Sequence, residues 1–375
     1  MARPLGSRSS TASSTLVGAL LREVVGDLRH RGEVHRRDFA TDEDVAAESA
    51  LASPGPATPL RRLLGRAERS WRVVVGLPRF SRGWRLYADD RSRAVLVKLL
   101  AYRLLGRRFV PLPMDPQAYW ASYEVARAQQ PLAPAREGGA GMRVAIFDLR
   151  PFGYEITARC RQGGIFAHCL LKQYELHRNG DDVDVREGDV VIDGGAAWGE
   201  TALIFAAKAG KTGRVVSAEV GEDVLPLFRE NLELNPDLAA GMELEESLLW
   251  NESDRTLSFS AGGPSGRVDE SGPSSGTTSF HTVSIDDLVE RRQLPRVDFI
   301  KLDVEGSERA VLEGAVKSLR AWRPRLAISA YHRPFDLVDI AAQVNSIVPG
   351  YRFYLDHFTD FGEETVLFAT ADPPA

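Results

Sequence analysis

Three acidic side chains stand close together in the second half of the chain, where they could accept protons or bind a cation. Asp303, Glu305 and Glu308 follow an apolar run at 297–302. Carboxylates this close repel one another unless a metal ion, Lys301, a histidine or shared protons offset their charge. Asp303 or Glu305 is therefore a candidate to remove a proton from an acceptor hydroxyl. The alternative interpretation is structural, because acids near a helix start cap the helix and favour its dipole.

One histidine comes at a position where a base or a metal ligand would be useful. His332 directly follows the apolar run 326–331, which predicts a strand, and imidazole changes its charge near neutral pH. With Asp303 and Glu305 it forms a hypothetical clamp for a divalent metal, although oxygen and imidazole ligands suit Mg²⁺ or Mn²⁺ only moderately. A structural histidine is the alternative interpretation, and His357 is a weaker candidate.

A second dense motif lies at 190–201, where an apolar run predicts a buried strand and glycines predict a tight loop before a helix. Glycine permits backbone angles and close approaches that a Cβ would forbid, and the N–H groups at a helix start point back into such a loop. These features predict a site for a cofactor that contains adenosine. The candidate residues of this motif are Asp193, Gly194, Gly195, Gly199, Glu200 and Thr201.

The position of the acids decides which cofactor the loop favours. The dinucleotide fingerprint G-x-G-x-x-G is missing, and Asp193 precedes the glycines, where it would repel a pyrophosphate. S-adenosylmethionine suits this acid better, because it carries an amino group and a sulfonium. Glu219 ends the next predicted strand, where a carboxylate would bind ribose hydroxyls. An NAD-linked oxidoreductase is kept as an alternative.

Strands and helices alternate from this loop onward, which predicts a doubly wound, mostly parallel sheet. Ligands of such sheets bind outside the carboxyl ends of the strands, so Ser247 and Leu248 are further candidates for cofactor binding. The last two strands are joined by a short turn and should pair antiparallel. The predicted strands are 188–192, 214–219, 242–247, 297–303, 325–331, 351–358 and 365–370, and the predicted helices include 199–209, 222–234 and 306–319.

The rest of the chain predicts an extension in front of this sheet. Residues 1–15 are rich in Ser, Thr and Arg and are predicted to be disordered, and 16–140 read as a mainly helical region with linkers. The domain with the sheet is predicted to cover 141–375. Within it, the segment 262–279 is rich in Gly, Ser and Pro and predicts a loop or the tip of a hairpin.

Composition excludes several classes of protein. The chain has 375 residues and a net charge of −5, whereas general nucleic-acid binding needs a basic surface. No apolar run approaches the ~18 residues that span a bilayer, and the apolar positions at 17–28 are interrupted by charges, so we expect an amphipathic helix and not a signal peptide. Cys160 and Cys169 are expected to be small buried thiols. We therefore predict a cytoplasmic protein.

The motifs at 193–203, 297–306, 326–332 and 364–369 together resemble the FkbM family of S-adenosylmethionine-dependent methyltransferases. The resemblance implies the class I methyltransferase fold, Rossmann-like with seven strands of which one is antiparallel, and methyl transfer to an acceptor oxygen. It also implies that Asp193, Gly195, Gly199 and Glu219 hold the cofactor, and that the acceptor faces Asp303, Glu305 and His332. The chain departs from many relatives at Ala197, where they carry Asn or Cys.

We therefore predict a methyltransferase that uses S-adenosylmethionine and acts on a hydroxyl of a glycan or natural product. The sequence gives no specificity signal for the acceptor and none for the oligomeric state. Two alternatives are kept: the NAD-linked oxidoreductase on a similar sheet, and a non-catalytic binding protein with a methyltransferase-like fold.

Overall fold

The computed structural model describes most of the chain. The described residues are 15–29, 59–106, 109–112, 115–138, 142–260, 267–269 and 277–372. Residues 1–14 of the segment predicted to be disordered, and most of the predicted loop 262–279, lie outside them. The division into an N-terminal region and a domain from 141 onward stays a prediction.

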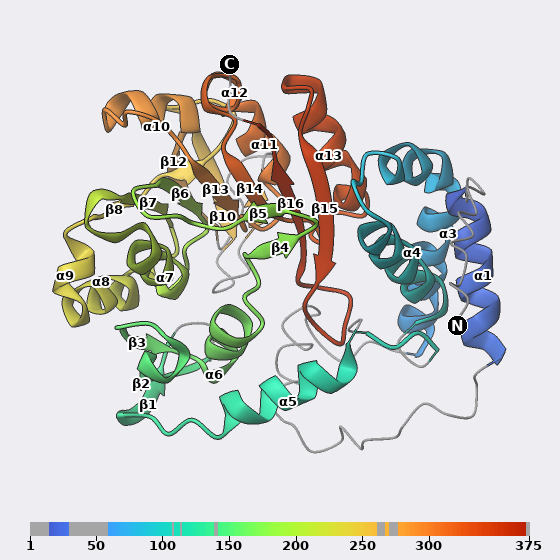
Figure 1. Cartoon of the computed structure of the whole chain (residues 1–375), viewed down its shortest axis with the longest axis horizontal. Helices are drawn as coiled ribbons and strands as arrows, with labels where there is room; N and C mark the ends of the chain where they lie inside the picture. The colour runs from blue at the N-terminus through green and yellow to red at the C-terminus, as the bar shows by residue number, and fades with distance from the viewer. Residues whose placement is uncertain are drawn as a thin grey trace, which may run out of the picture.

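A seven-stranded sheet forms the centre of the molecule (Figure 1), in the order β15-β16-β14-β13-β6-β7-β8. All neighbouring pairs are parallel except those that involve β16, which runs antiparallel to both β14 and β15. The predicted fold class, including the antiparallel pairing of the last two strands, is confirmed. The strands are β6 (Val190–Gly194), β7 (Arg214–Ala218), β8 (Met242–Glu245), β13 (Phe299–Leu302), β14 (Arg325–Ser329), β15 (Arg352–His357) and β16 (Thr365–Thr370).

Every residue of β6, β13, β14 and β16 is buried, because helices cover the sheet. In the view of Figure 1, α10 to α13 lie along the upper side of the sheet and α7 to α9 at the lower left. These helices are α7 (Glu200–Ala209), α8 (Leu225–Leu234), α9 (Pro236–Ala239), α10 (Ile285–Arg291), α11 (Glu308–Glu313), α12 (Val316–Trp322) and α13 (Asp336–Ile347).

The single helix predicted at 306–319 is wrong, because the structure has two shorter helices there, α11 and α12. Gly314 lies between them and packs so closely that an added Cβ would stand 2.3 Å from the carbonyl oxygen of Trp250. This close approach to another segment ends α11. Helices α13 and α5 (Pro116–Arg127) were not predicted.

Smaller sheets surround the central one. One has three strands in the order β1-β2-β3, another has four in the order β11-β10-β12-β9, and β4 and β5 form a hairpin. Cys160, at the end of β3, and Cys169 are both free and buried, as predicted. The bounds are β1 (Ala133–Glu137), β2 (Arg143–Asp148), β3 (Thr157–Cys160), β4 (Leu176–Arg178), β5 (Asp181–Val183), β9 (Leu248–Leu249), β10 (Thr256–Ser260), β11 (Arg267–Asp269) and β12 (Thr277–Val283).

Three N-terminal helices pack together beside the β15 edge of the central sheet, with α4 next to the strand and α1 outermost (Figure 1). They are α1 (Leu16–Arg29), α3 (Pro59–Trp84) and α4 (Asp90–Leu105). The backbone N–H of Ala88 donates to the carbonyl of Phe353 at 2.8 Å, and the Ser92 hydroxyl accepts from the N–H of Leu355 at 2.9 Å. Apolar residues of these helices and of the sheet belong to one core, so the helices are continuous with it.

Helix α3 lies against α13 through two glycines. A Cβ added to Gly83 would stand 2.3 Å from Val338, and one added to Gly76 would stand 2.5 Å from the ring of Phe335. Arg79 adds a paired hydrogen bond to the carboxylate of Asp339 on α13. Close packing and a charged contact therefore fix the orientation of α3. Among the described residues, no helix combines the length and apolar character needed to cross a membrane.

Candidate functional site

The order of strands reverses at β6, which makes its carboxyl end the expected place for a ligand. The next strand on one side is β13, with Lys301 paired to Asp193 and Leu302 paired to Gly194. The N–H of Asp303 donates to the carbonyl of Gly194 at 3.0 Å. The two motifs that the sequence analysis found far apart therefore lie side by side, with the glycine loop next to the acids.

The glycine loop has an unusual backbone. Gly195, Ala197 and Gly199 have φ values of 74°, 45° and 85°, a region that favours glycine. A Cβ on Gly195 would stand 1.8 Å from the carbonyl oxygen of Asp303. Gly199 precedes the first residue of α7, so the loop delivers the N-terminus of that helix to the carboxyl edge of the sheet.

Glu219 contacts this loop from the end of β7. Its Oε2 accepts the N–H of Ala197 at 2.8 Å, and its Oε1 accepts the N–H groups of Val220 and Gly221 at 2.8 Å each. Burial raises the pKa of Glu219. The absence of a polar side chain at position 197 is explained here, because the loop uses only the backbone N–H of Ala197.

Asp193 lies beneath the loop and is fully buried. Its Oδ1 stands 3.1 Å from Nζ of Lys301, and its Oδ2 accepts the Thr201 hydroxyl at 3.0 Å. Lys301 also donates to the carbonyl oxygens of Gly194 at 3.2 Å and Gly195 at 2.7 Å. Burial lowers the pKa of Lys301, but the neighbouring carboxylates Asp193 and Asp303 outweigh it and raise that pKa. The pair holds the loop in place from below.

The other predicted cofactor residues take different positions. Glu200 is buried at the start of α7 next to Gly164, and burial raises its pKa to about 7. Leu248 packs in a small apolar cluster with Val220, the residue after Glu219. Ser247 is half-buried between β8 and β9. The structure therefore brings Leu248 near the end of β7 and places the Glu200 carboxylate beside Gly164.

The three predicted acceptor-facing residues meet at one point. Nε2 of His332 lies 3.5 Å from Oδ1 of Asp303 and 3.4 Å from Oε2 of Glu305. Nδ1 of the same ring lies 2.8 Å from Oε1 of Glu308, which also accepts the N–H groups of Val304 and Gly306. Glu308 thus orients His332 so that Nε2 faces the two other carboxylates. We call Asp303, Glu305 and His332 the acid–histidine cluster.

The structural interpretation is correct only for Glu308, which lies in the first turn of α11. Ser307 is the N-cap residue of α11, but its side chain makes no capping hydrogen bond. Glu305 has a φ of 54°, which is rare for a residue with a Cβ and places its carboxylate beside His332. A backbone held in this region is often found at functional sites.

Residues from distant segments surround Asp303. The Tyr174 hydroxyl donates to Oδ2 of Asp303 at 2.9 Å, and the Tyr331 hydroxyl lies 3.4 Å from both Asp303 and Glu364. Gln173 donates to the other oxygen of Glu364. Neither Tyr174 nor Gln173 carried a signal in the sequence. Tyr331 and Glu364 fall in the quoted motifs, but nothing in their spacing showed that they would meet Asp303.

Burial and charge act together on the ionisation of the cluster. Burial lowers the pKa of His332, but Glu308 and the two cluster carboxylates outweigh it and raise that pKa to about 10. Burial raises the pKa of Asp303, but His332 and Lys301 outweigh it and lower that pKa. Burial raises the pKa of Glu305 to about 8, with Asp303, Glu308 and Glu364 adding to it and His332 opposing it.

Two groups of side chains in the described part of the chain have ligand atoms within 4.8 Å of one another, as a metal site requires. One is the acid–histidine cluster. The other is Glu175, His177 and Asp184, where Nζ of Lys208 already lies 2.6 Å from Glu175 and 2.7 Å from Asp184. An internal cation therefore takes the place that a metal would need in the second group. His357 belongs to neither group and contacts Thr365.

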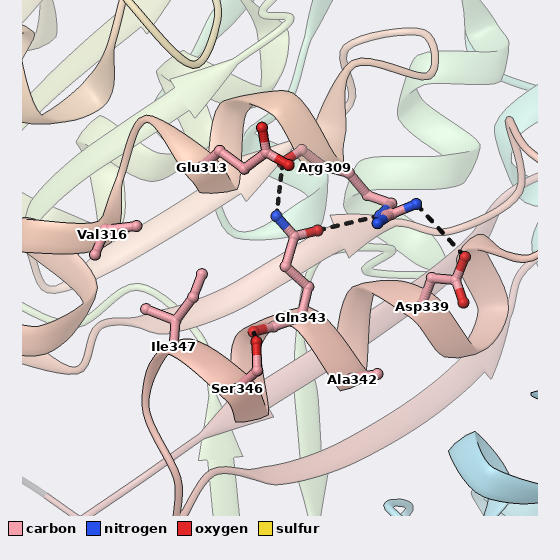
Figure 2. Close-up of a pocket in the computed structure, with 8 residues that line it drawn as sticks. All are labelled: Arg309, Glu313, Val316, Asp339, Ala342, Gln343, Ser346 and Ile347. Atoms are coloured by element: carbon pink, nitrogen blue, oxygen red, sulfur yellow. Dashed lines mark hydrogen bonds and ion pairs between the residues drawn. The ribbon is translucent and has the colours of Figure 1, made fainter.

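A surface groove lies on the outer side of α11 and α13 (Figure 2). Gln343 and Arg309 cross it with two hydrogen bonds, and Arg309 reaches Asp339 at 3.6 Å. None of the predicted site residues lines this groove. The residues that line it are Arg309, Glu313, Val316, Asp339, Ala342, Gln343, Ser346 and Ile347.

The strand order and the glycine loop define the class I methyltransferase fold. The crystal structure of methyltransferase FkbM from Methylobacillus flagellatus KT aligns with 80% of this chain and 60% of its own length, at a TM-score of 0.51 and 22% identity. Residues 182–359 match the family model described as the methyltransferase FkbM domain. The chain therefore carries a domain of the FkbM methyltransferase family.

Two curated relatives match shorter stretches. Hexuronic acid methyltransferase AglP from Haloferax volcanii is 28% identical over 138 residues, which cover 37% of this chain and 54% of the relative. Ubiquinone/menaquinone biosynthesis C-methyltransferase UbiE from Hydrogenovibrio crunogenus is 33% identical over 87 residues, which cover 23% of this chain and 32% of the relative. The chain thus spans about half or less of the length of these relatives.

We predict that removing one partner of the Asp193–Lys301 pair destabilises the fold more than neutralising both partners does. Lys301→Met should destabilise the fold by roughly 3–5 kcal/mol, because it leaves a buried carboxylate without a partner. Adding Asp193→Asn to this variant should restore part of the loss. Urea unfolding of the two single variants and the double variant measures the coupling. If the loss of unfolding free energy in the double variant equals the sum of the losses in the two single variants, the two side chains act independently.

Proposed function

We propose that this chain is an S-adenosylmethionine-dependent O-methyltransferase that acts on a hydroxyl of a glycan or natural product. One observation carries the proposal: the register of β6 and β13 sets a cofactor-type glycine loop directly beside a cluster of proton-accepting side chains. A methyl donor held in the loop and a hydroxyl held at the cluster would meet across this edge of the sheet.

The loop fits the cofactor in shape and in charge. A carboxylate has about four acceptor positions, and backbone N–H groups use three of those on Glu219, which leaves capacity for a ribose hydroxyl. Gly195 lets the loop pack against the carbonyl of Asp303 and Gly199 lets it pack against the ring of Phe228, and Asp193 supports the loop through Lys301. The bound cofactor supplies an electrophilic methyl group on a sulfonium. In this proposal Gly194, Glu200, Thr201, Ser247 and Leu248 complete the surroundings of the cofactor.

Glu305 accepts the proton of the acceptor hydroxyl. Its Oε2 faces His332, and no described residue donates a hydrogen bond to its Oε1, so one oxygen remains for the acceptor. The cofactor would supply the methyl group and retain the electron pair of its carbon–sulfur bond, and Glu305 would take the hydroxyl proton of the acceptor. Asp303 and His332 position the hydroxyl. A pKa near the working pH suits a general base.

The class of acceptor rests on two further observations. The name of the relative AglP states a hexuronic acid as its substrate, which supports a glycan acceptor. The relative UbiE is named a C-methyltransferase, so transfer to oxygen rests on the carboxylates of this chain and not on kinship. A net charge of −5 favours a small molecule or glycan over a nucleic acid. Cytoplasmic location stays a prediction.

We predict that the protein binds S-adenosylmethionine and not NADH. Isothermal calorimetry with each compound should give heat only for S-adenosylmethionine, and Glu219→Gln should weaken that binding about tenfold or more, because an ionised acceptor of the ribose hydroxyls is lost. Glu233→Gln, at an exposed acid on α8, is a matched control that should bind normally. Tight binding of NADH alone would overturn the proposed function and support the oxidoreductase alternative.

We predict that the reaction accelerates as the pH rises through about 8, because Glu305 must lose its proton before it can act as a base and burial raises its pKa to that value. Glu305→Gln should lower kcat by roughly 10²–10⁴-fold and remove this pH dependence. Transfer of labelled methyl groups from S-adenosylmethionine to methyl glycosides of hexoses and hexuronic acids is the assay.

Glu313→Gln, an exposed acid on α11, is the matched control and should keep the wild-type pH profile. Unchanged cofactor affinity in Glu305→Gln would assign the loss to chemistry. Normal cofactor binding with no transfer to any glycoside by the wild type would instead support a non-catalytic binding protein.

A divalent metal is the competing explanation for the acid–histidine cluster, because Nε2 of His332 and the two carboxylates form a possible ligand set. We expect no metal to be needed, since His332 and Lys301 already offset the acids. Dialysis against EDTA should leave the transfer rate unchanged, and Mn²⁺ should not increase it. Loss of activity in EDTA with recovery in Mn²⁺ would assign the cluster to a metal. In that case His177→Gln tests whether the metal is bound instead by the second group, Glu175, His177 and Asp184.

A further inference from the structure

One arginine beside the acid–histidine cluster has a free charged group. Arg333 directly follows His332 and is exposed. A Cβ added to Gly306 would stand 3.4 Å from Nε of Arg333 and 3.6 Å from Cβ of His332. The arginine therefore lies along the turn that follows Glu305. Among the described residues, its hydrogen bonds are those of its backbone, and its guanidinium group has no ion-pair partner.

The backbone that carries this arginine is fixed by the fold. Its N–H donates to Oδ2 of Asp336 at 2.8 Å, and its carbonyl accepts the N–H of Asp336 at 3.2 Å. The carbonyl of the next residue, Pro334, accepts a hydrogen bond from Arg103 of α4 at 2.6 Å. The Asp336 carboxylate thus serves the backbone of Arg333 and forms no ion pair with its side chain. The position of Arg333 is set, while its guanidinium group stays available to a ligand.

The acids nearest to Arg333 in the cluster region are engaged with another cation. Oε1 of Glu308 lies 2.8 Å from Nδ1 of His332 and also accepts two backbone N–H groups. Oε2 of Glu305 faces Nε2 of the same ring at 3.4 Å. His332 is therefore the cation that offsets these carboxylates. The positive charge of Arg333 is not used in the internal ion pairs of the site.

The charge of the cluster restricts how an acceptor with a negative group could bind. The side chains of Asp303 and Glu305 are each 21% exposed, whereas that of His332 is 6% exposed, so a ligand meets the two carboxylates first. Like charges repel at such short range, which excludes a carboxylate or phosphate from the cluster itself. A negatively charged acceptor would have to place its hydroxyl at Glu305 and its anionic group outside the cluster. Arg333 offers a cation at that place.

We propose that Arg333 binds an anionic group of the acceptor and so selects a sugar that carries a carboxylate or a phosphate near the hydroxyl to be methylated. A guanidinium group is planar and matches either anion with two parallel hydrogen bonds. The inference rests on the proposed function, because it takes Glu305 as the place of the hydroxyl. Arg333 determines the choice of acceptor in this proposal and leaves the affinity for S-adenosylmethionine unchanged.

Methyl transfer to a matched series of acceptors tests the inference. The series is a methyl hexuronide, its uncharged methyl ester, the corresponding methyl hexoside and the phosphate ester of that hexoside. We expect kcat/KM for at least one charged acceptor to exceed that for the uncharged ones about tenfold or more, because hydrogen bonds between charged groups are strong. Arg333→Gln should remove this preference by raising KM, with kcat and the rate on the methyl hexoside unchanged. Arg333→Lys should keep part of it, since the charge remains and the paired geometry is lost.

Arg320→Gln is the matched control and should keep the preference, because Arg320 is an exposed arginine on α12, which precedes β14, whereas His332 follows that strand. The charged acceptor with the lower KM identifies the anion as carboxylate or phosphate. Equal rates on charged and uncharged acceptors would overturn the inference and leave the proposed methyl transfer standing, and so would an unchanged preference in Arg333→Gln.

If no acceptor is methylated, the proposed function fails, and binding then decides on the anion site alone. Calorimetry with S-adenosylhomocysteine present measures the affinity for the methyl hexuronide and for the phosphate ester without turnover. Binding of either compound that Arg333→Gln weakens about tenfold supports the site. Absence of binding by the wild type, or equal binding by Arg333→Gln, overturns it.

Discussion

A buried ion pair between two neighbouring strands organises the candidate site. Lys301 is 2% exposed and Asp193 is fully buried, so neither charge is solvated by water. The ammonium group reaches the carboxylate on β6 and two carbonyl oxygens of the loop that follows it. One side chain of β13 therefore fixes the loop beside it. Both the backbone that would hold a cofactor and the position of Asp303, two residues further on, depend on this contact.

The second feature of the site is a balance of positive and negative charges that are largely, but not fully, shielded from solvent. Four acids, Asp303, Glu305, Glu308 and Glu364, are packed near one histidine and one lysine. Each cation has a defined place: His332 lies between Glu308 and the other two cluster acids, and Lys301 lies between Asp193 and the loop. The raised pKa of Glu305 and the lowered pKa of Asp303 follow from this unequal distribution. Two carboxylates one residue apart are thereby suited to different roles.

Local patterns in the sequence were sufficient for the sheet and for the two motifs at its centre. Apolar runs that end at Asp193 and Asp303 predicted two strand ends at the same edge of the sheet, because parallel strands place their carboxyl ends together. That the two strands are direct neighbours is shown by the structure. Sequence patterns could not reveal Tyr174 or Gln173, which lie in a turn that follows the π-helix Ile165–Leu170 and reach the site only through tertiary packing. Glu308 was interpreted only as an acid at the start of a helix. Its contact with His332 forms through the fold and leaves no signal in the sequence. The break between α11 and α12 at Gly314 could not be predicted either, because it depends on the close contact with Trp250.

The cover on the β15 edge has a consequence for how the domain can be used. An edge strand with unpaired N–H and C=O groups is a template for pairing with another chain. Here Ser92 and the backbone of Ala88 occupy part of that template, and a continuous apolar core joins α1, α3 and α4 to the sheet. The N-terminal helices thus protect this edge strand from pairing with another chain. They are not a module that recombination could exchange for another without supplying a new cover for this strand.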